Sequence, residues 1–134
     1  MNGKAFFDTN VLVYAALKND PRSEPAEELL SVGGVISVQV LNEFVSVARR
    51  KFKMPWEDVR VALQWIRILC SDTLPLTIET HEEAVRIAER YEYQIYDSLI
   101  VASALEAKCG VLYSEDLRDG QVIDGIMTIR SPFR

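Results

Sequence analysis

KAFFDTNVLVY, residues 4–14, is the stretch that decides the fold. Its apolar start predicts a strand over Lys4–Phe7, and Asp8 ends that run. The next residues are ambiguous, because their β-branched side chains suit a strand while their length after Asp8-Thr9-Asn10 suits a helix. We favour a helix over Val11–Leu17. The carboxylate of Asp8 is then expected between the end of a strand and the start of a helix.

Short apolar runs and helix-period runs alternate along the rest of the chain. This alternation favours an α/β fold with a largely parallel, covered sheet of about five strands. The further strands are expected at Val35–Val38, Leu74–Ile78, Val111–Tyr113 and Ile126–Ile129. The further helices are expected around Ala26–Leu30, Val40–Phe52, Val59–Cys70, Ala84–Tyr91 and Leu99–Ala107, the last apolar nearly all round and therefore buried.

Length and composition bound the class of protein. A chain of 134 residues that is 49% apolar can bury one ordinary core, so we expect a single domain over residues 1–134. No apolar stretch approaches the roughly 18 residues that span a bilayer, and Asp8 interrupts the run that a signal peptide would need. We therefore expect no membrane partner and a cytoplasmic location.

Cysteine usage and charge exclude two further classes of function. Cys70 and Cys109, with one histidine in the chain, support neither a zinc site nor a disulfide framework, and we expect buried thiols. The net charge of −5 argues against a protein that coats nucleic acid through overall positive charge. Any contact with nucleic acid must be local.

Four acidic residues stand where apolar runs end or where a helix lies beside a strand end: Asp8, Glu43, Asp97 and Asp116. Two ionised carboxylates about 5 Å apart repel by roughly 3 kcal/mol at an effective dielectric constant near 20. A cluster of them would either take up protons or bind a hard cation such as Mg²⁺ or Mn²⁺. The second outcome would make the cluster a metal-ion site.

Each acid also has an ordinary structural interpretation. Asp8 and Asp97 both precede helix-period runs, so either can be an N-cap, a role compatible with metal ligation because the helix dipole keeps a carboxylate ionised. Asp116 lies in a loop beside Glu115, which competes with it for a metal. Glu43 lies about 140° from the centre of its helix's apolar face, so periodicity alone predicts an exposed side chain.

Four segments occur in a recognisable order: Phe7–Tyr14, Leu41–Phe44, Tyr96–Ala104 and Ser114–Gln121. Together they resemble a PIN domain, the fold of metal-dependent ribonucleases that includes the VapC-like toxins of toxin-antitoxin pairs. The likeness covers nearly the whole chain. It implies a three-layer α/β/α fold in which helices flank the mainly parallel sheet.

The resemblance also implies roles for individual residues. Asp8, Asp97 and Asp116 would hold Mg²⁺ or Mn²⁺, while Glu43 would complete the shell or orient the attacking water. Groups that support the acids or position the substrate are implied at Thr9, Asn10 and Ser114. The implied partners are an RNA substrate and a VapB-like protein antitoxin.

A carboxylate site without a usable histidine favours metal-assisted hydrolysis of a phosphodiester bond. We expect single-stranded or loop RNA, since a flexible strand can be drawn into a cleft. The acidic surface then requires a local cationic rim, for which Arg49 and Arg50 are candidates, although cations favour helix C-termini in any case. We also expect a homodimer. Candidates for its contact or for an antitoxin groove are Trp56, Trp65, Tyr91 and Tyr93, with core packing as the alternative.

Two other classes of function share parts of this pattern. A receiver-type phosphoacceptor domain or a phosphatase of the haloacid dehalogenase type also gathers acids around Mg²⁺. The phosphatase expects a second Asp where Asn10 stands, and the receiver expects a Lys where Arg130 stands. A non-catalytic PIN-fold binding module is the other class, and the complete quartet argues against it. The resemblance thus implies a Mg²⁺- or Mn²⁺-dependent endoribonuclease, the toxin of a VapBC-like pair, with a free-standing PIN nuclease as the alternative.

Overall fold

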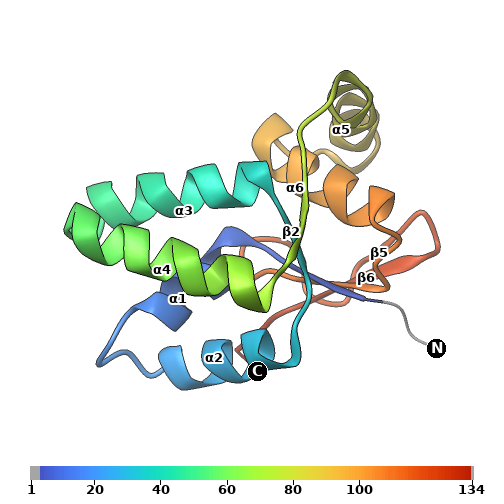
Figure 1. Cartoon of the computed structure of the whole chain (residues 1–134). Helices are drawn as coiled ribbons and strands as arrows, with labels where there is room; N and C mark the ends of the chain where they lie inside the picture. Colours follow the sequence, from blue (N-terminus) through green and yellow to red (C-terminus); the bar gives the residue numbers. More distant parts are fainter. Residues whose placement is uncertain (1–3, 134) are drawn as a thin grey trace.

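The computed structural model describes residues 4–133 (Figure 1). Within them, a six-stranded sheet forms the middle layer, with the strand order β3-β2-β1-β4-β6-β5. Every neighbouring pair is parallel except β5 and β6. The strands are β1 (Ala5–Phe7), β2 (Val35–Ser37), β3 (Asp72–Leu74), β4 (Val111–Tyr113), β5 (Val122–Ile123) and β6 (Met127–Arg130).

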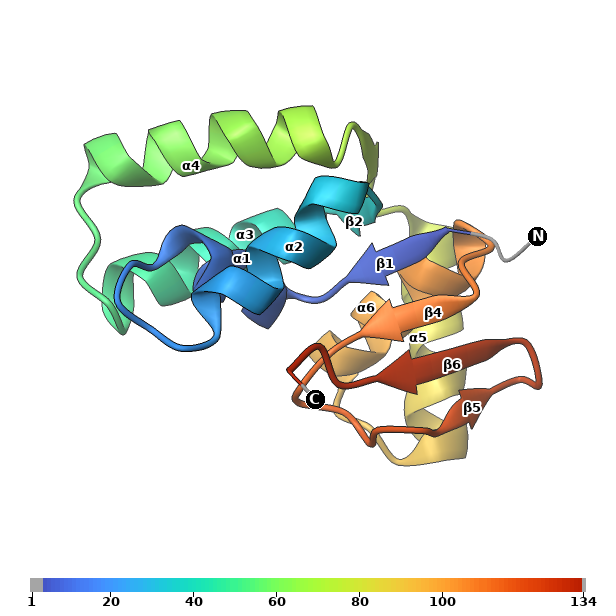
Figure 2. The same ribbon diagram turned by 90° about the horizontal axis from the view of Figure 1, so that it is seen from below.

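Helices form the two outer layers. They are α1 (Thr9–Ala16), α2 (Ser23–Val32), α3 (Val38–Arg50), α4 (Trp56–Leu69), α5 (Ile78–Tyr91) and α6 (Ile95–Glu106). Figure 1 shows α5 and α6 on one side of the sheet and α1 and α2 on the other. In Figure 2, α1 and α3 lie beyond the ends toward which the arrows of β1, β4 and β6 point. The predicted three-layer α/β/α fold is confirmed.

The core follows from the apolar pattern of the strands and of α6. Phe6 and Phe7 of β1 and Leu112 of β4 are at most 1% exposed. Helix α6 is buried on most of its surface, and it packs along α5. Small side chains such as Ser98 and Ala102 are among its buried residues, as the sequence predicted for a buried helix.

Gly34 allows β2 to start close beside β1. A Cβ atom at this position would collide with the ring of Phe7 and would lie 2.8 Å from the carbonyl oxygen of Ala5. Only glycine avoids both contacts, because it has no side chain to place there. The pairing of β1 with β2 therefore depends on this residue.

Two of the predicted strands need correction, and one strand was missed. The segment Leu74–Ile78 is not a strand, because β3 ends at Leu74 and α5 begins at Ile78. The last strand is shifted by one residue, to Met127–Arg130. Strand β5 pairs with it through a tight turn in which Asp124 and Gly125 have φ of 52° and 70°. Two residues are too few to give a periodic signal, so the sheet has six strands where five were predicted.

Two expectations about chemistry away from the sheet ends can also be checked. Cys70 and Cys109 are free and buried, and burial raises the pKa of each thiol to about 11. They are the buried thiols that the sequence predicted.

Among residues 4–133, no helix combines the length and the apolar character needed to cross a membrane.

Candidate metal centre

The candidate site lies at the carboxyl ends of β1 and β4. These strands are parallel neighbours with Phe7 opposite Tyr113, so the next residues, Asp8 and Ser114, leave the sheet side by side. The chain runs from β1 to β2 on one side, whereas β4 lies on the other side. Such a switch point leaves a crevice at the carboxyl edge of an open α/β sheet, which is where these folds bind ligands.

Asp8 is the most buried member of the cluster, at 3% exposed. It is the N-cap of α1, and its carboxylate accepts hydrogen bonds from the Thr9 backbone N–H at 2.6 Å and from the Ser114 hydroxyl at 2.7 Å. Burial, reinforced by the negative charges of Asp116 and Glu43, raises its pKa to about 7. A nearby cation would favour the ionised form that metal ligation requires.

Glu43 extends from α3 toward α1. Its carboxylate accepts hydrogen bonds from the Thr9 hydroxyl at 2.9 Å and from the Gln39 amide at 2.8 Å. The prediction from periodicity that Glu43 is exposed was wrong, because the side chain is half-buried. Helix α3 packs against α1 as well as against the core, so its polar side faces protein.

Asp97 belongs to the first turn of α6. The expectation that it caps this helix was wrong, since the helix begins at Ile95 and Gln94 is the N-cap. Partial burial raises the pKa of Asp97, and the charges of Asp116 and Glu43 raise it further, while the Gln94 amide, 3.3 Å away, lowers it. The same two acids thus act on both Asp8 and Asp97.

Asp116 is the exposed member of the cluster, and two contacts hold its position. The Asn10 amide donates to its carboxylate at 3.3 Å, and its own backbone N–H donates to the Ser114 hydroxyl at 3.1 Å. Ser114 therefore links Asp8 to Asp116. The four predicted acids form one electrostatic cluster, in which the N-cap of α1, α3, α6 and the loop after β4 each contribute one carboxylate.

The donor set suits a hard divalent cation. All of its donors are carboxylate oxygens, which Mg²⁺ and Mn²⁺ prefer. Within residues 4–133, however, no three Asp, Glu, His or Cys side chains already form a ready group of ligands around one point. Binding an ion would require the carboxylates to draw together, a movement that their mutual repulsion opposes until the cation arrives.

Glu115 and Asp116 differ in their surroundings. The Glu115 carboxylate lies 3.9 Å from the Arg22 guanidinium, which also pairs with Asp20 and stacks 3.8 Å from the centre of the Tyr14 ring. Asp116 instead contacts Asn10, beside the other acids. The geometry favours Asp116 as the fourth acid and leaves Glu115 with a cation of the protein itself.

The three predicted supporting residues each donate to one acid: Ser114 to Asp8, Thr9 to Glu43 and Asn10 to Asp116. Sequence reasoning missed two further donors, Gln39 and Gln94. Both stand one helical turn before the acid that they contact, so the i,i+4 and i,i+3 spacings were the available signal. The link from Arg22 to Glu115 had no such local signal.

A pocket of about 220 Å³ opens beside the cluster. Thr9, Asn10, Glu43 and Asp116 belong to its lining, and so do Lys51 and Phe52. The predicted RNA contacts, Arg49 and Arg50, are not among its lining residues. Arg49 donates to the Met54 carbonyl at 2.9 Å and stacks on Trp56, and Arg50 donates to Ser46 at 3.0 Å. Their role in RNA binding stays a prediction.

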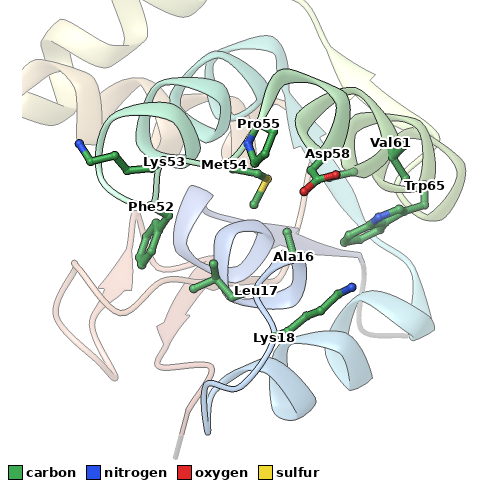
Figure 3. A pocket seen from close by; sticks show the side chains of 11 residues that line it. Ala16, Leu17, Lys18, Phe52, Lys53, Met54, Pro55, Asp58, Val61 and Trp65 are labelled. Atoms are coloured by element: carbon green, nitrogen blue, oxygen red, sulfur yellow. The ribbon is translucent and has the colours of Figure 1, made fainter.

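A larger groove of about 500 Å³ lies between the end of α1, the connection from α3 to α4, and α4 itself (Figure 3). Phe52 lines both this groove and the pocket beside the acids. Eight of its eleven lining residues are apolar, Leu17, Met54, Val61 and Trp65 among them, and the charged ones are Lys18, Lys53 and Asp58.

Comparison with known proteins agrees with the predicted fold. A search of curated protein sequences gives no match. Solved structures match over most of the chain. VapC20 of Mycobacterium tuberculosis, described as a toxin that cleaves the sarcin-ricin loop, is 19% identical with a TM-score of 0.69, covering 82% of this chain and 88% of its own.

Two complexes give similar values. A toxin-antitoxin complex from Klebsiella pneumoniae is 18% identical with a TM-score of 0.72, over 96% of this chain and 98% of the matched chain. A DNA-bound VapBC from Salmonella typhimurium is 21% identical with a TM-score of 0.67, over 98% and 99%. The family model for the PIN domain matches residues 5–122. The chain therefore belongs to the PIN domain family.

Proposed function

We propose that this protein is a divalent-metal-dependent endoribonuclease and the toxin of a toxin-antitoxin pair. The observation that carries the proposal is the gathering of Asp8, Glu43, Asp97 and Asp116 at the β1–β4 edge, where burial and, after it, the charges of Glu43 and Asp116 raise the pKa of the other two. Membership of the PIN family supports it. We further propose that residues 1–134 form one domain that acts in the cytoplasm, where RNA is available.

The proposed chemistry follows from the donors around each acid. Asp8, Asp97 and Asp116 would hold Mg²⁺ or Mn²⁺, and Glu43, fixed by Thr9 and Gln39, would complete the shell or orient the attacking water. A bound ion supplies a water of lowered pKa and offsets negative charge on the phosphate. Ser114 and the Thr9 N–H would hold the Asp8 carboxylate in one orientation, as supporting hydrogen bonds do for metal ligands generally.

A protein antitoxin is the proposed regulatory partner. The Klebsiella, Salmonella and similar structures are described as toxin-antitoxin or VapBC assemblies, which supports the proposal by likeness of fold. The groove of Figure 3 shares Phe52 with the pocket beside the acids, and its lining is apolar except for Lys18, Lys53 and Asp58. A VapB-like segment with apolar side chains on one face and acidic ones beside them would fit it.

Purified protein and labelled single-stranded RNA test the proposal directly. We expect cleavage with Mg²⁺ or Mn²⁺ and none with EDTA. Asp8→Asn and Asp97→Asn should each lower the rate by about 100-fold or more, since an oriented group that stabilises developing charge contributes roughly that much. Glu82→Gln, on the exposed side of α5, makes the same change in net charge and should leave the rate unchanged.

Cleavage that survives EDTA and both Asn variants would contradict the proposal. Equal losses in Glu82→Gln would also contradict it, because net charge rather than the cluster would then control the rate. Circular dichroism and thermal unfolding of every variant exclude a loss of activity through misfolding.

A further inference from the structure

The pocket beside the acids is also lined by apolar and aromatic side chains. Further along α1 and α3 than Thr9 and Glu43, the lining consists of Val13, Tyr14 and Val47, followed by Lys51 and Phe52 after the end of α3. Apolar and aromatic side chains do not help to hold a hard cation. This part of the pocket is therefore suited to a ligand other than a metal ion.

The two aromatic rings are held in different ways. Tyr14 is 8% exposed and is fixed between the Arg22 guanidinium, 3.8 Å from its ring centre, and the ring of Phe133, 5.4 Å away edge to face. Phe52 is only half-buried, so part of its ring remains accessible. Phe52 thus offers a surface for stacking, whereas Tyr14 offers a rigid wall.

The charges around this part of the pocket select the kind of ligand. Lys51 is exposed, and its ammonium lies 5.4 Å from the centre of the Phe52 ring. Glu115 also lines the pocket, but its carboxylate lies 3.9 Å from the Arg22 guanidinium, which offsets its charge. An aromatic ring with an exposed lysine ammonium over it suits a flat group that carries a phosphate next to it.

The volume of the pocket limits the size of the ligand. About 220 Å³ falls below the roughly 300–1,000 Å³ of pockets that enclose drug-sized ligands. Single-stranded RNA presents flat unpaired bases that stack on aromatic side chains, and each base is joined to phosphates that cations contact. One base fits the requirements, whereas a protein helix would need the larger groove on the other side of Phe52.

We propose that this part of the pocket binds one unpaired base of the RNA next to the bond that is cut, with Phe52 as the stacking surface and Lys51 as the contact to a neighbouring phosphate. The proposal rests on the ribonuclease function proposed above and adds a subsite to it. Phe52 and Lys51 are positioning residues, since neither touches the reacting atoms. They set where along a strand the carboxylates act.

The test uses a set of RNAs of one sequence, each with a single abasic position stepped across the cleaved bond. With the wild-type protein, one abasic position should raise the RNA concentration for half-maximal single-turnover cleavage by roughly 10-fold or more, as expected for the loss of one stacked base. The rate at saturating RNA should change much less. Lys51→Gln should lower the slope of log affinity against log salt by about one.

Phe52→Leu removes the aromatic surface and keeps an apolar side chain, while Phe52→Tyr is the matched control. In Phe52→Leu, the concentration of intact RNA for half-maximal cleavage should rise to the value that the abasic RNA needs with the wild-type protein. The abasic position should not raise that concentration further in this variant. Phe52→Tyr should behave as the wild type. Thermal unfolding checks that each variant folds, and the abasic series in the wild-type protein needs no variant.

Equal cleavage of every abasic RNA by the wild-type protein overturns the proposal. Unchanged half-saturation in Phe52→Leu, with the abasic penalty retained, overturns it as well and leaves this surface to a protein segment. Failure of the ribonuclease function itself looks different, because the wild-type protein would then not cleave intact RNA in a metal-dependent way.

Discussion

The carboxylate site and the groove between α1 and α4 share the ring of Phe52 and differ in how they are built. In the site, hydrogen bonds join residues that are far apart in the sequence, such as Ser114 to Asp8 and Asn10 to Asp116. The groove is walled mainly by apolar side chains, and Val61 there is 54% exposed. Catalysis requires carboxylates held in a fixed orientation, whereas binding a protein partner requires an accessible apolar surface. The two regions should therefore respond differently to substitution.

The largest effect is expected in the pH dependence of stability. The pKa of Asp8 is raised from 3.8 to about 7 in the folded protein, mainly by burial. Between about pH 4 and 7, the folded state keeps a proton that the unfolded state releases, so without metal the free energy of unfolding falls as the pH rises. About three pKa units correspond to at most about 4 kcal/mol.

Urea unfolding at pH 5 and pH 8 in EDTA measures this effect. Asp8→Asn cannot titrate at this position, so it should lose less stability between the two pH values than the wild type does. Val61→Gln, in the groove, should lose as much as the wild type. If the free energy of unfolding falls equally with pH in Asp8→Asn and in the wild type, Asp8 is not the group that causes the fall, and the site does not differ from the groove in this respect.

The second effect is a difference in RNA cleavage between substitutions at two adjacent acids. Asp116→Asn should lower RNA cleavage by about 100-fold, since it removes a carboxylate from the cluster. Glu115→Gln should lower it by less than about 5-fold, because this carboxylate lies beside Arg22. Single-turnover rates at saturating RNA make the comparison, and the reverse ranking would make Glu115 the fourth acid.

A smaller effect is expected where one hydroxyl links two acids. Ser114→Ala removes the donor to Asp8 and the acceptor of the Asp116 N–H. We expect a loss of roughly 10-fold in metal affinity and of about 1–3 kcal/mol in stability, because a buried polar group is left unpaired. Ser31→Ala, at an exposed hydroxyl of α2, is the control and should cost little. Equal effects of the two substitutions would mean that Ser114 does not organise the site.

The smallest effect is expected in the groove. Val61→Gln should change the stability by less than about 0.5 kcal/mol and RNA cleavage by less than about 2-fold, because the side chain is already exposed. Thermal unfolding and cleavage rates check this. A loss of cleavage comparable with that of Asp116→Asn would show that the groove takes part in the chemistry.

Local signals explain what the sequence predicted correctly. An apolar run that ends at an acid and continues as a helix is a short-range pattern, so the strand β1, the cap at Asp8 and the helix α1 follow from residues 4–14 alone. The small and apolar residues of α6 predicted a buried helix in the same way. The order of the four segments then predicted the family, which the match over residues 5–122 confirms.

The incorrect predictions concern features that long-range contacts decide. The half-burial of Glu43 depends on α1 lying against α3, which no helical period reveals. Strand β5 has only two residues and exists because β6 pairs with it. The contact of Glu115 with Arg22 was not predicted either way, because Arg22 is more than 90 residues earlier in the chain. Alternation of side chains within a loop could suggest that two adjacent acids diverge, but not which partner each would meet.

A titration with Mn²⁺ or Mg²⁺, followed by thermal unfolding at pH 7.5, tests the central claim that these carboxylates share a divalent ion. The account predicts that the ion raises the melting temperature of the wild-type protein and of Glu82→Gln, and raises that of Asp8→Asn and Asp97→Asn much less or not at all. Equal stabilisation of all four proteins, or none in any of them, would contradict it.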